Sequence, residues 1–229
     1  MQSQEQALDQ IFEKLKGKAC VKQNTFRTIQ EVFKDIETEA KDIIKQLNTR
    51  INKVDKSVEV KFIEKNKYEF HLKVGSDMLI FSLATNVVTF NNEYVVMQSD
   101  YIKEKDERKY FGQIMVYNFL SDTIKYNRLD DPGYLIARLI VNDEKHFFVE
   151  GAQQLNFLFT DIVNNVISQA WLRLLIEKCI LTAVDMDLIG SSYHEIQNTN
   201  LLKKMKNEKP MGNGQKVGFQ MDYMNDIKA

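Results

Sequence analysis

The chain has 229 residues, of which 44% are hydrophobic and 28% are charged, as is typical of a folded globular protein. Its 31 basic and 32 acidic residues nearly cancel, so no overall electrostatic field draws it to nucleic acid or to a membrane surface. Two cysteines and three histidines argue against a dedicated Cys/His metal site, and we expect no metal and no cofactor.

The sequence also suggests a cellular compartment. The first residues lack the basic-then-apolar order of a secretory leader, and the longest apolar-rich stretch, 155–189, is interrupted by charged residues that include Asp161, Arg173, Glu177 and Lys178. Cys20 and Cys179 lie far apart, which favours free thiols over a disulfide. We therefore expect a cytoplasmic protein without a membrane segment.

Two helices are predicted at the N-terminus. Residues 4–16 place four apolar side chains at helical spacing, namely Leu8, Ile11, Phe12 and Leu15. Gly17 follows, where helices often end, and Asn24 or Thr25 can cap a second helix that runs to about residue 54. This order predicts a helical hairpin.

The second helix carries the strongest periodic signal in the chain. Its apolar residues alternate at spacings of three and four, as in a helix that packs along its length against another helix. The predicted interaction seam consists of Phe26, Ile29, Phe33, Ile36, Ile43 and Leu47, with Ala40 and Val54 in the same phase. The seam can be satisfied within one subunit or between two, and the sequence leaves both possibilities open.

From Ser57 the apolar period changes to two, which predicts strands. Turn spacing predicts a five-strand meander over residues 57–98, with Phe62 opposite Tyr68 and Phe70 opposite Phe81. Its last two strands are expected at 87–90 and 94–98. After a charged connection at 99–109, four more strands are expected at about 110–119, 123–127, 134–142 and 146–150, giving an antiparallel sheet of about nine strands.

A long helix is predicted from about 153 to 187, packed on the sheet, and the remaining residues are typical of a mobile tail. The fold class is therefore α+β. Residues 1–56 form a helical segment packing on the core, residues 57–189 form the sheet and C-terminal helix of the same domain, and residues 190–229 form the tail.

One pattern could support catalysis. Glu59 and Lys61 form a Glu-x-Lys pair on a strand, which Mg²⁺-dependent nucleases use to hold the metal and position water. The simpler interpretation is a solvated strand face with cross-strand pairs, Glu59 to His71 and Lys61 to Glu69. We favour the simpler interpretation, because three common residues make a weak motif.

Two further features suggest binding. Aromatic side chains could line an apolar cavity between the sheet and the C-terminal helix; the candidates are Phe70, Phe81, Phe90, Tyr117 and Trp171. A filled core is the competing interpretation. The lysine-rich stretch Lys203–Lys216 could contact phosphates, which is the one route to nucleic acid that the sequence offers.

The sequence contains a clear packing seam and no convergent catalytic set. We therefore expect a non-enzymatic protein-interaction or assembly module, such as a bacterial adaptor or chaperone-like protein, which binds a protein partner or a second copy of itself. A small-molecule-binding domain is the first alternative, and a Mg²⁺-dependent nuclease using Glu59 and Lys61 is the second.

Overall fold

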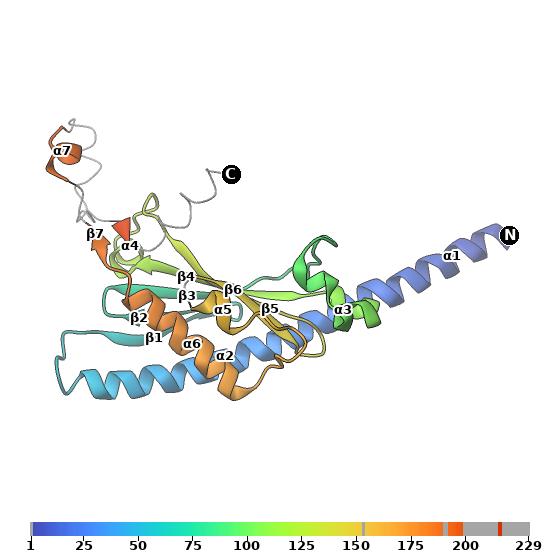
Figure 1. Cartoon of the computed structure of the whole chain (residues 1–229), viewed down its shortest axis with the longest axis horizontal. Coiled ribbons are helices and arrows are strands. Elements are labelled where there is room, and N and C mark those ends of the chain that lie inside the picture. The colour runs from blue at the N-terminus through green and yellow to red at the C-terminus, as the bar shows by residue number, and fades with distance from the viewer. Residues whose placement is uncertain (1, 153, 190–191, 199–214, 217–229) are drawn as a thin grey trace.

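The computed structural model describes residues 2–152, 154–189, 192–198 and 215–216. The chain has an α+β fold in which a six-stranded antiparallel sheet carries helices α2 and α6 on one face. Helix α1 extends beyond the sheet as the first part of one long N-terminal rod (Figure 1). No helix in the described part of the chain has the length and apolar character needed to cross a membrane.

The predicted helical hairpin at the N-terminus is wrong. The structure has one long, continuous helical rod there. Helix α1 (Gln2–Lys14) continues through a π-helical turn, η1 (Leu15–Cys20), directly into α2 (Val21–Ile51). Gly17 lies within the π turn instead of ending a helix. A single glycine costs a helix only about 1 kcal/mol, and its neighbours include Leu, Lys and Ala, which favour helix.

The sheet is a simple meander with strand order β1-β2-β3-β4-β5-β6. The strands are β1 (Val60–Asn66), β2 (Glu69–Val74), β3 (Asp77–Leu83), β4 (Gly112–Leu120), β5 (Tyr134–Val141) and β6 (Phe147–Gly151). The expected number of nine strands is therefore wrong. A separate two-stranded ribbon is formed by β7 (Leu188–Ile189) and β8 (Gln215–Lys216).

Three predicted strands have other conformations. The segments expected at 87–90 and 94–98 form an isolated bridge at Val88 and the 3₁₀ turn η2 (Val95–Gln98). The segment expected at 123–127 lies largely in a short helix, α4 (Ser121–Lys125), with Asp122 in its first turn, where the helix dipole favours an acidic residue. Runs of so few apolar residues do not distinguish a strand from a buried turn.

Two of the predicted registers are right, those of β2 with β3 and of β5 with β6. Phe70 lies opposite Phe81 across a turn in which Gly75 adopts a φ of 60°, the conformation that a type II′ turn requires. The pairing of β5 with β6 also agrees, including Arg138 opposite Glu150. The β1–β2 register differs, because Phe62 lies opposite Leu72 instead of Tyr68. The slip is an even number of residues, so the same side chains still face the core.

The connection between β3 and β4 covers part of the other sheet face. It includes η2, α3 (Asp100–Glu104) and η3 (Asp106–Lys109). Its apolar residues form a second cluster with outward-facing residues of β5 and β6 and with Ile162 from the segment that follows β6. The buried members of this cluster are Val96, Met97, Ile102, Phe111, Ile140, Phe148 and Ile162. The charged stretch at 99–109 is thus a packed connection.

The predicted helix at 153–187 is interrupted. The structure has α5 (Leu155–Leu158), an irregular segment and α6 (Gln169–Val184). The irregular segment runs along the edge of β6, where the Val149 amide donates to the Phe159 carbonyl at 3.0 Å and the Phe147 amide donates to the Asn165 carbonyl at 3.0 Å. The hydrogen bonds that cover this sheet edge stabilise the irregular conformation more than the helix-forming pattern of the sequence stabilises a helix.

The end of the chain is only partly described. Helix α7 (Tyr193–Ile196) follows the ribbon strand β7. The predicted tail therefore lies mostly outside the described residues, and so does all of the lysine-rich stretch Lys203–Lys216 except its last two residues.

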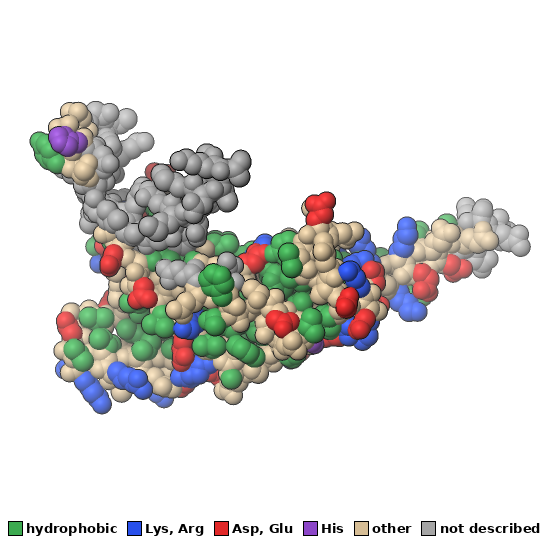
Figure 2. All heavy atoms as spheres, in the orientation of Figure 1, with side chains coloured by type: hydrophobic (Ala, Val, Ile, Leu, Met, Phe, Trp, Pro, Cys, Tyr) green, Lys and Arg blue, Asp and Glu red, His purple; other side chains and the backbone are tan. Residues whose placement is uncertain are grey.

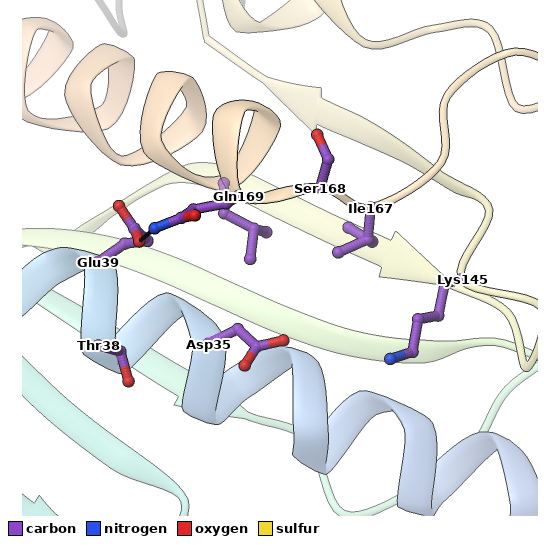
Figure 3. A pocket seen from close by; sticks show the side chains of 8 residues that line it. Asp35, Thr38, Glu39, Lys145, Ile167, Ser168 and Gln169 are labelled. Carbon is purple, nitrogen blue, oxygen red and sulfur yellow. Dashed lines mark hydrogen bonds between the residues drawn. The ribbon is translucent and has the colours of Figure 1, made fainter.

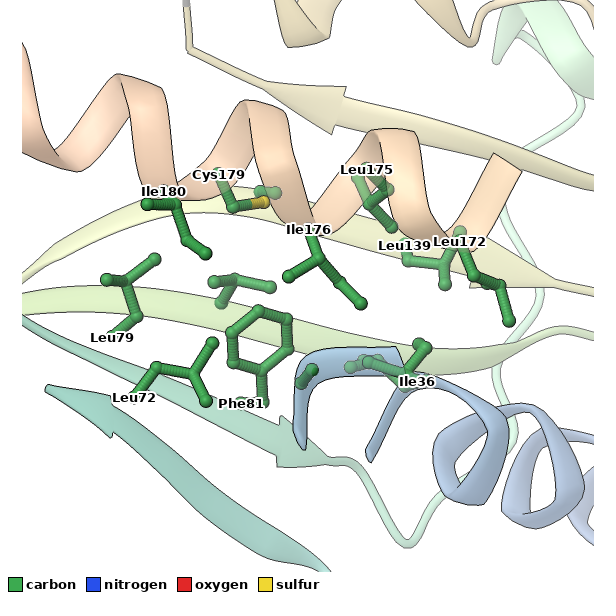
Figure 4. Packing of buried hydrophobic residues seen from close by; sticks show 14 of the residues in the cluster. Ile36, Leu72, Leu79, Phe81, Leu139, Leu172, Leu175, Ile176, Cys179 and Ile180 are labelled. Atoms are coloured by element: carbon green, nitrogen blue, oxygen red, sulfur yellow. The ribbon is translucent and has the colours of Figure 1, made fainter. Parts of the chain in front are cut away.

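The main core lies between the sheet and the two helices. Phe81 and Leu139 of the sheet, Ile36 of α2, and Ile176 and Cys179 of α6 are all essentially inaccessible to solvent. Figure 4 shows these side chains meeting in one layer. The apolar stripe of α2 is therefore used to cover the chain's own sheet.

Truncating this layer destabilises the fold. We expect Ile36→Ala to lower the free energy of unfolding by about 2–5 kcal/mol, since it removes a fully buried side chain and leaves a cavity. Leu8→Ala on α1 is the matched control and should change it by less than about 0.5 kcal/mol, because Leu8 is 66% exposed. Urea denaturation measures both, and equal losses would contradict the assigned core.

The approach of α2 to β4 depends on a glycine. A methyl group at Gly112 would lie 2.6 Å from Ile29 Cβ, so Gly112→Ala must push the helix off the strand. We expect a loss of about 1–3 kcal/mol in unfolding free energy. Gly17→Ala, where a methyl group meets nothing within 4 Å, should cause no loss. Thermal unfolding measures both variants. An unchanged melting temperature in Gly112→Ala would show that α2 does not pack this closely against β4.

Candidate functional site

The predicted interaction seam lies inside its own subunit. Four of its residues, Ile29, Phe33, Ile36 and Ile43, are at most 4% exposed, and the partly buried Phe26 and Leu47 pack against the same core. These six side chains contact the sheet and α6. The chain's own elements therefore bury most of the seam, while Phe26 and Leu47 keep partial exposure.

The aromatic residues predicted to line a cavity do not share one. Phe70 and Phe81 stack in the core with ring centroids 4.8 Å apart, and Trp171 on α6 contacts Phe159. Phe90 belongs to the second cluster, and Tyr117 alternates with core residues of β4 and so faces the opposite side. Side chains of the main core occupy the space between the sheet and α6.

The Glu59 and Lys61 pair forms ion pairs on the β1 edge of the sheet. The Glu59 carboxylate accepts hydrogen bonds from Lys61 and from Lys73 on β2, while His71 bonds to Glu69 at 2.7 Å. The predicted pairs Glu59–His71 and Lys61–Glu69 are therefore wrong, because the register slipped. Among the described residues, no three His, Cys, Asp or Glu side chains are placed to hold a metal ion.

This ion-paired carboxyl titrates unusually low. Hydrogen bonds from Lys61 and then Lys73 lower the pKa of Glu59 from 4.5 to about 2. The depressed pKa favours the folded state above pH 4.5, and this contribution is lost as the pH falls toward 2. NMR titration of the side-chain carboxyl should show this midpoint, and Lys61→Ala with Lys73→Ala should return it toward 4.5. A midpoint already near 4.5 in the unmodified protein would contradict the pairing.

A polar cleft of about 370 Å³ lies between α2 and the start of α6. Asp35, Thr38 and Glu39 line it from α2, and Ser168 and Gln169 line it from the opposite wall (Figure 3). Residues Lys145, Ile167 and Leu172 complete the lining. The sequence gives no sign of this cleft, because its two walls are about 130 residues apart and neither carries a motif.

The polar groups of this cleft hold the two helices together. Glu39 is 7% exposed, and its carboxylate accepts a hydrogen bond from Gln169 and lies 3.5 Å from Arg173. Arg173 also bonds to Asp42 at 2.9 Å. The most buried carboxylate is thus already satisfied by α6. These hydrogen bonds and ion pairs act as a clasp between α2 and α6. They explain the position of α6 without requiring a ligand.

The second groove, of about 320 Å³, continues along the same helix pair. Ile43, Leu47 and Arg50 of α2 line it together with Arg173, Glu177, Ile180 and Leu181 of α6 and Gln46 of α2. Its walls combine apolar side chains with ion-paired ones, such as Arg173 with Glu177 at 3.1 Å. Both hollows therefore lie along the contact between α2 and α6.

The most distinctive surface is on α1. Leu8, Ile11 and Phe12 of α1, together with Leu15 at the start of η1, form one stripe along the rod, and each of them is between 54% and 66% exposed. We call these four residues the α1 stripe. Figure 2 shows the helix standing clear of the body of the molecule, and Figure 1 shows it beyond the end of the sheet. The sequence predicted this amphipathic helix, but not that its apolar side would lack a cover within the domain.

Comparison with protein-family models, with curated proteins and with solved structures gave no match. The function is therefore argued from the chain's own residues.

Proposed function

We propose that the protein is a non-enzymatic interaction or assembly module, of the adaptor or chaperone-like kind, and that α1 is its contact element. The observation that carries the proposal is the α1 stripe, which presents four large apolar side chains to solvent on a projecting helix. A helix with one apolar face gains stability by laying that face against another surface.

The energetics support a binding role for this stripe. Fully burying a Leu, Ile or Phe side chain contributes about 1.5–3 kcal/mol, and these four residues keep more than half of their surface in water. Scattered exposed apolar residues are normal, whereas four adjacent ones on one helix face form a contiguous patch. Such a patch favours docking of a helix or a groove.

The proposal moves the contact from the α2 seam to α1. The seam supports an interaction role poorly, since its side chains are engaged in the core of the same chain. The small-molecule alternative has less support, because the expected apolar cavity is filled and the polar cleft carries satisfied groups. The nuclease alternative has less support because Glu59 is paired with two lysines.

Site-specific photo-crosslinking in cells that express the full chain tests the proposal. A photoreactive residue at Ala7, beside the α1 stripe, should give defined adducts, and the same residue at the exposed Lys45 of α2 should not. Leu8→Ser with Leu15→Ser should reduce the adducts about tenfold or more, since every 1.4 kcal/mol of lost apolar contact weakens binding tenfold.

The stripe variant must remain folded for this comparison to hold. Both leucines are more than half exposed, so its thermal unfolding should match that of the unmodified protein. Adducts that persist unchanged in the stripe variant, or an Ala7 position that gives none, would overturn the proposed contact element.

A further inference from the structure

We propose that the α1 stripe pairs with the α1 stripe of a second copy of this chain, with the two helices antiparallel. This inference depends on the proposed function, because it names the partner of the same surface. Three features of the described residues support it: the symmetry of the stripe, the order of charges along α1 and the continuity of α1 with α2.

The first feature is the symmetry of the stripe about its own centre. Its four residues lie at positions 8, 11, 12 and 15, so reversing the helix exchanges Leu8 with Leu15 and Ile11 with Phe12. An antiparallel pair related by a twofold axis therefore sets apolar side chains against apolar side chains at every level. This is the self-complementarity that a twofold interface requires.

The second feature is the order of charges along the rod. Residues 2–11 contain Glu5 and Asp9 and no basic residue, which gives a net charge of −2. Residues 12–21 contain Lys14, Lys16 and Lys18 with one acidic residue, which gives +2. An antiparallel pair places the acidic half of each copy against the basic half of the other, whereas a parallel pair places like charges together.

One pair of charges is placed to determine the orientation. Asp9 and Lys16 each follow a leucine of the stripe and are seven residues apart, so they flank it on nearly the same side of the helix. In the antiparallel pair, Asp9 of each copy lies beside Lys16 of the other. Among the described residues, Lys16 is paired only with Glu13, through a long, exposed contact of 3.9 Å, which leaves the Lys16 side chain accessible to a second copy.

The third feature is that α1 is an extension of a helix already anchored in the core. An isolated helix of this length is marginal in water, because forming its first turn is unfavourable. Here α2 supplies the nucleus, and the helix continues through the π turn without a break. The contact has only four large apolar side chains per copy, so association is weak and depends on concentration.

Sedimentation equilibrium on the full chain tests the pairing. The mass should rise from 26.8 kDa toward twice that value as the concentration increases from low to high micromolar. Asp9→Lys alone and Lys16→Asp alone should each weaken the association by about tenfold, and the two changes together should restore it. Gln10→Lys, on the side of α1 away from the stripe, is the control and should leave it unchanged.

The native cysteines allow the orientation to be measured directly. Cys20 is exposed and Cys179 is buried, so a spin label attaches at Cys20. In an antiparallel pair centred on the stripe, the two Cys20 positions are 17 residues apart along the axis, which is roughly 25 Å. Pulsed electron paramagnetic resonance should give a distance of that order or slightly longer, whereas a parallel pair would bring the labels to the same level.

The outcomes separate this inference from the proposed function. A strictly monomeric protein at all concentrations, a short label distance, or a double charge swap that fails to restore association would each overturn antiparallel self-pairing. A monomer whose Ala7 adducts are with another protein would leave the proposed function standing. A monomeric protein whose adducts do not depend on the α1 stripe would overturn both the self-pairing and the proposed function.

Discussion

The structure depends on the burial of one face of α2 between the sheet and α6. Ile29 and Ile36 are completely shielded from solvent, and Ile29 sits so close to β4 that only a glycine fits opposite it, at Gly112. Burial of this many apolar side chains is the dominant favourable contribution to folding. The apolar face of α2, which gives the strongest periodic pattern in the sequence, is therefore buried in the core of its own subunit.

Two consequences follow for the helices around this face. Helix α6 must lie beside α2 to close the core, and Gln169 and Arg173 of α6 fix that position by contacting the buried Glu39 carboxylate of α2. Leaving the Glu39 carboxylate without these partners would be costly, so the clasp favours one arrangement of the two helices. Beyond the sheet the rod continues as α1, where the domain no longer covers its apolar side.

Local sequence patterns predicted the parts of the fold that depend on local rules. The alternation of Phe70 and Leu72, with a turn at Gly75, was enough to predict the β2–β3 register, and a short hairpin did the same for Arg138 and Glu150. The amphipathic pattern of residues 4–16 likewise predicted the helix that carries the α1 stripe.

The predictions that were wrong concern segments whose structure the local sequence pattern does not determine. The β6 edge needed hydrogen-bond acceptors from Phe159 and Asn165, so a helical pattern there was overridden. The rod crossed Gly17 because nothing packs against that position and no residue forces the helix to end. The clasp between Glu39 and Gln169 joins residues with no shared motif, and no pattern in either segment could reveal it.

The α2 seam is buried within the subunit, whereas the α1 stripe remains exposed to solvent. Hydrogen–deuterium exchange of the dilute protein tests this contrast most directly, since amide protection reports local opening. We expect strong protection of the amides over 29–44 and fast exchange over 6–15, and only the exchange over 6–15 should slow as the protein concentration rises. Protection of α1 equal to that of α2 in dilute solution, or fast exchange along the α2 seam, would contradict it.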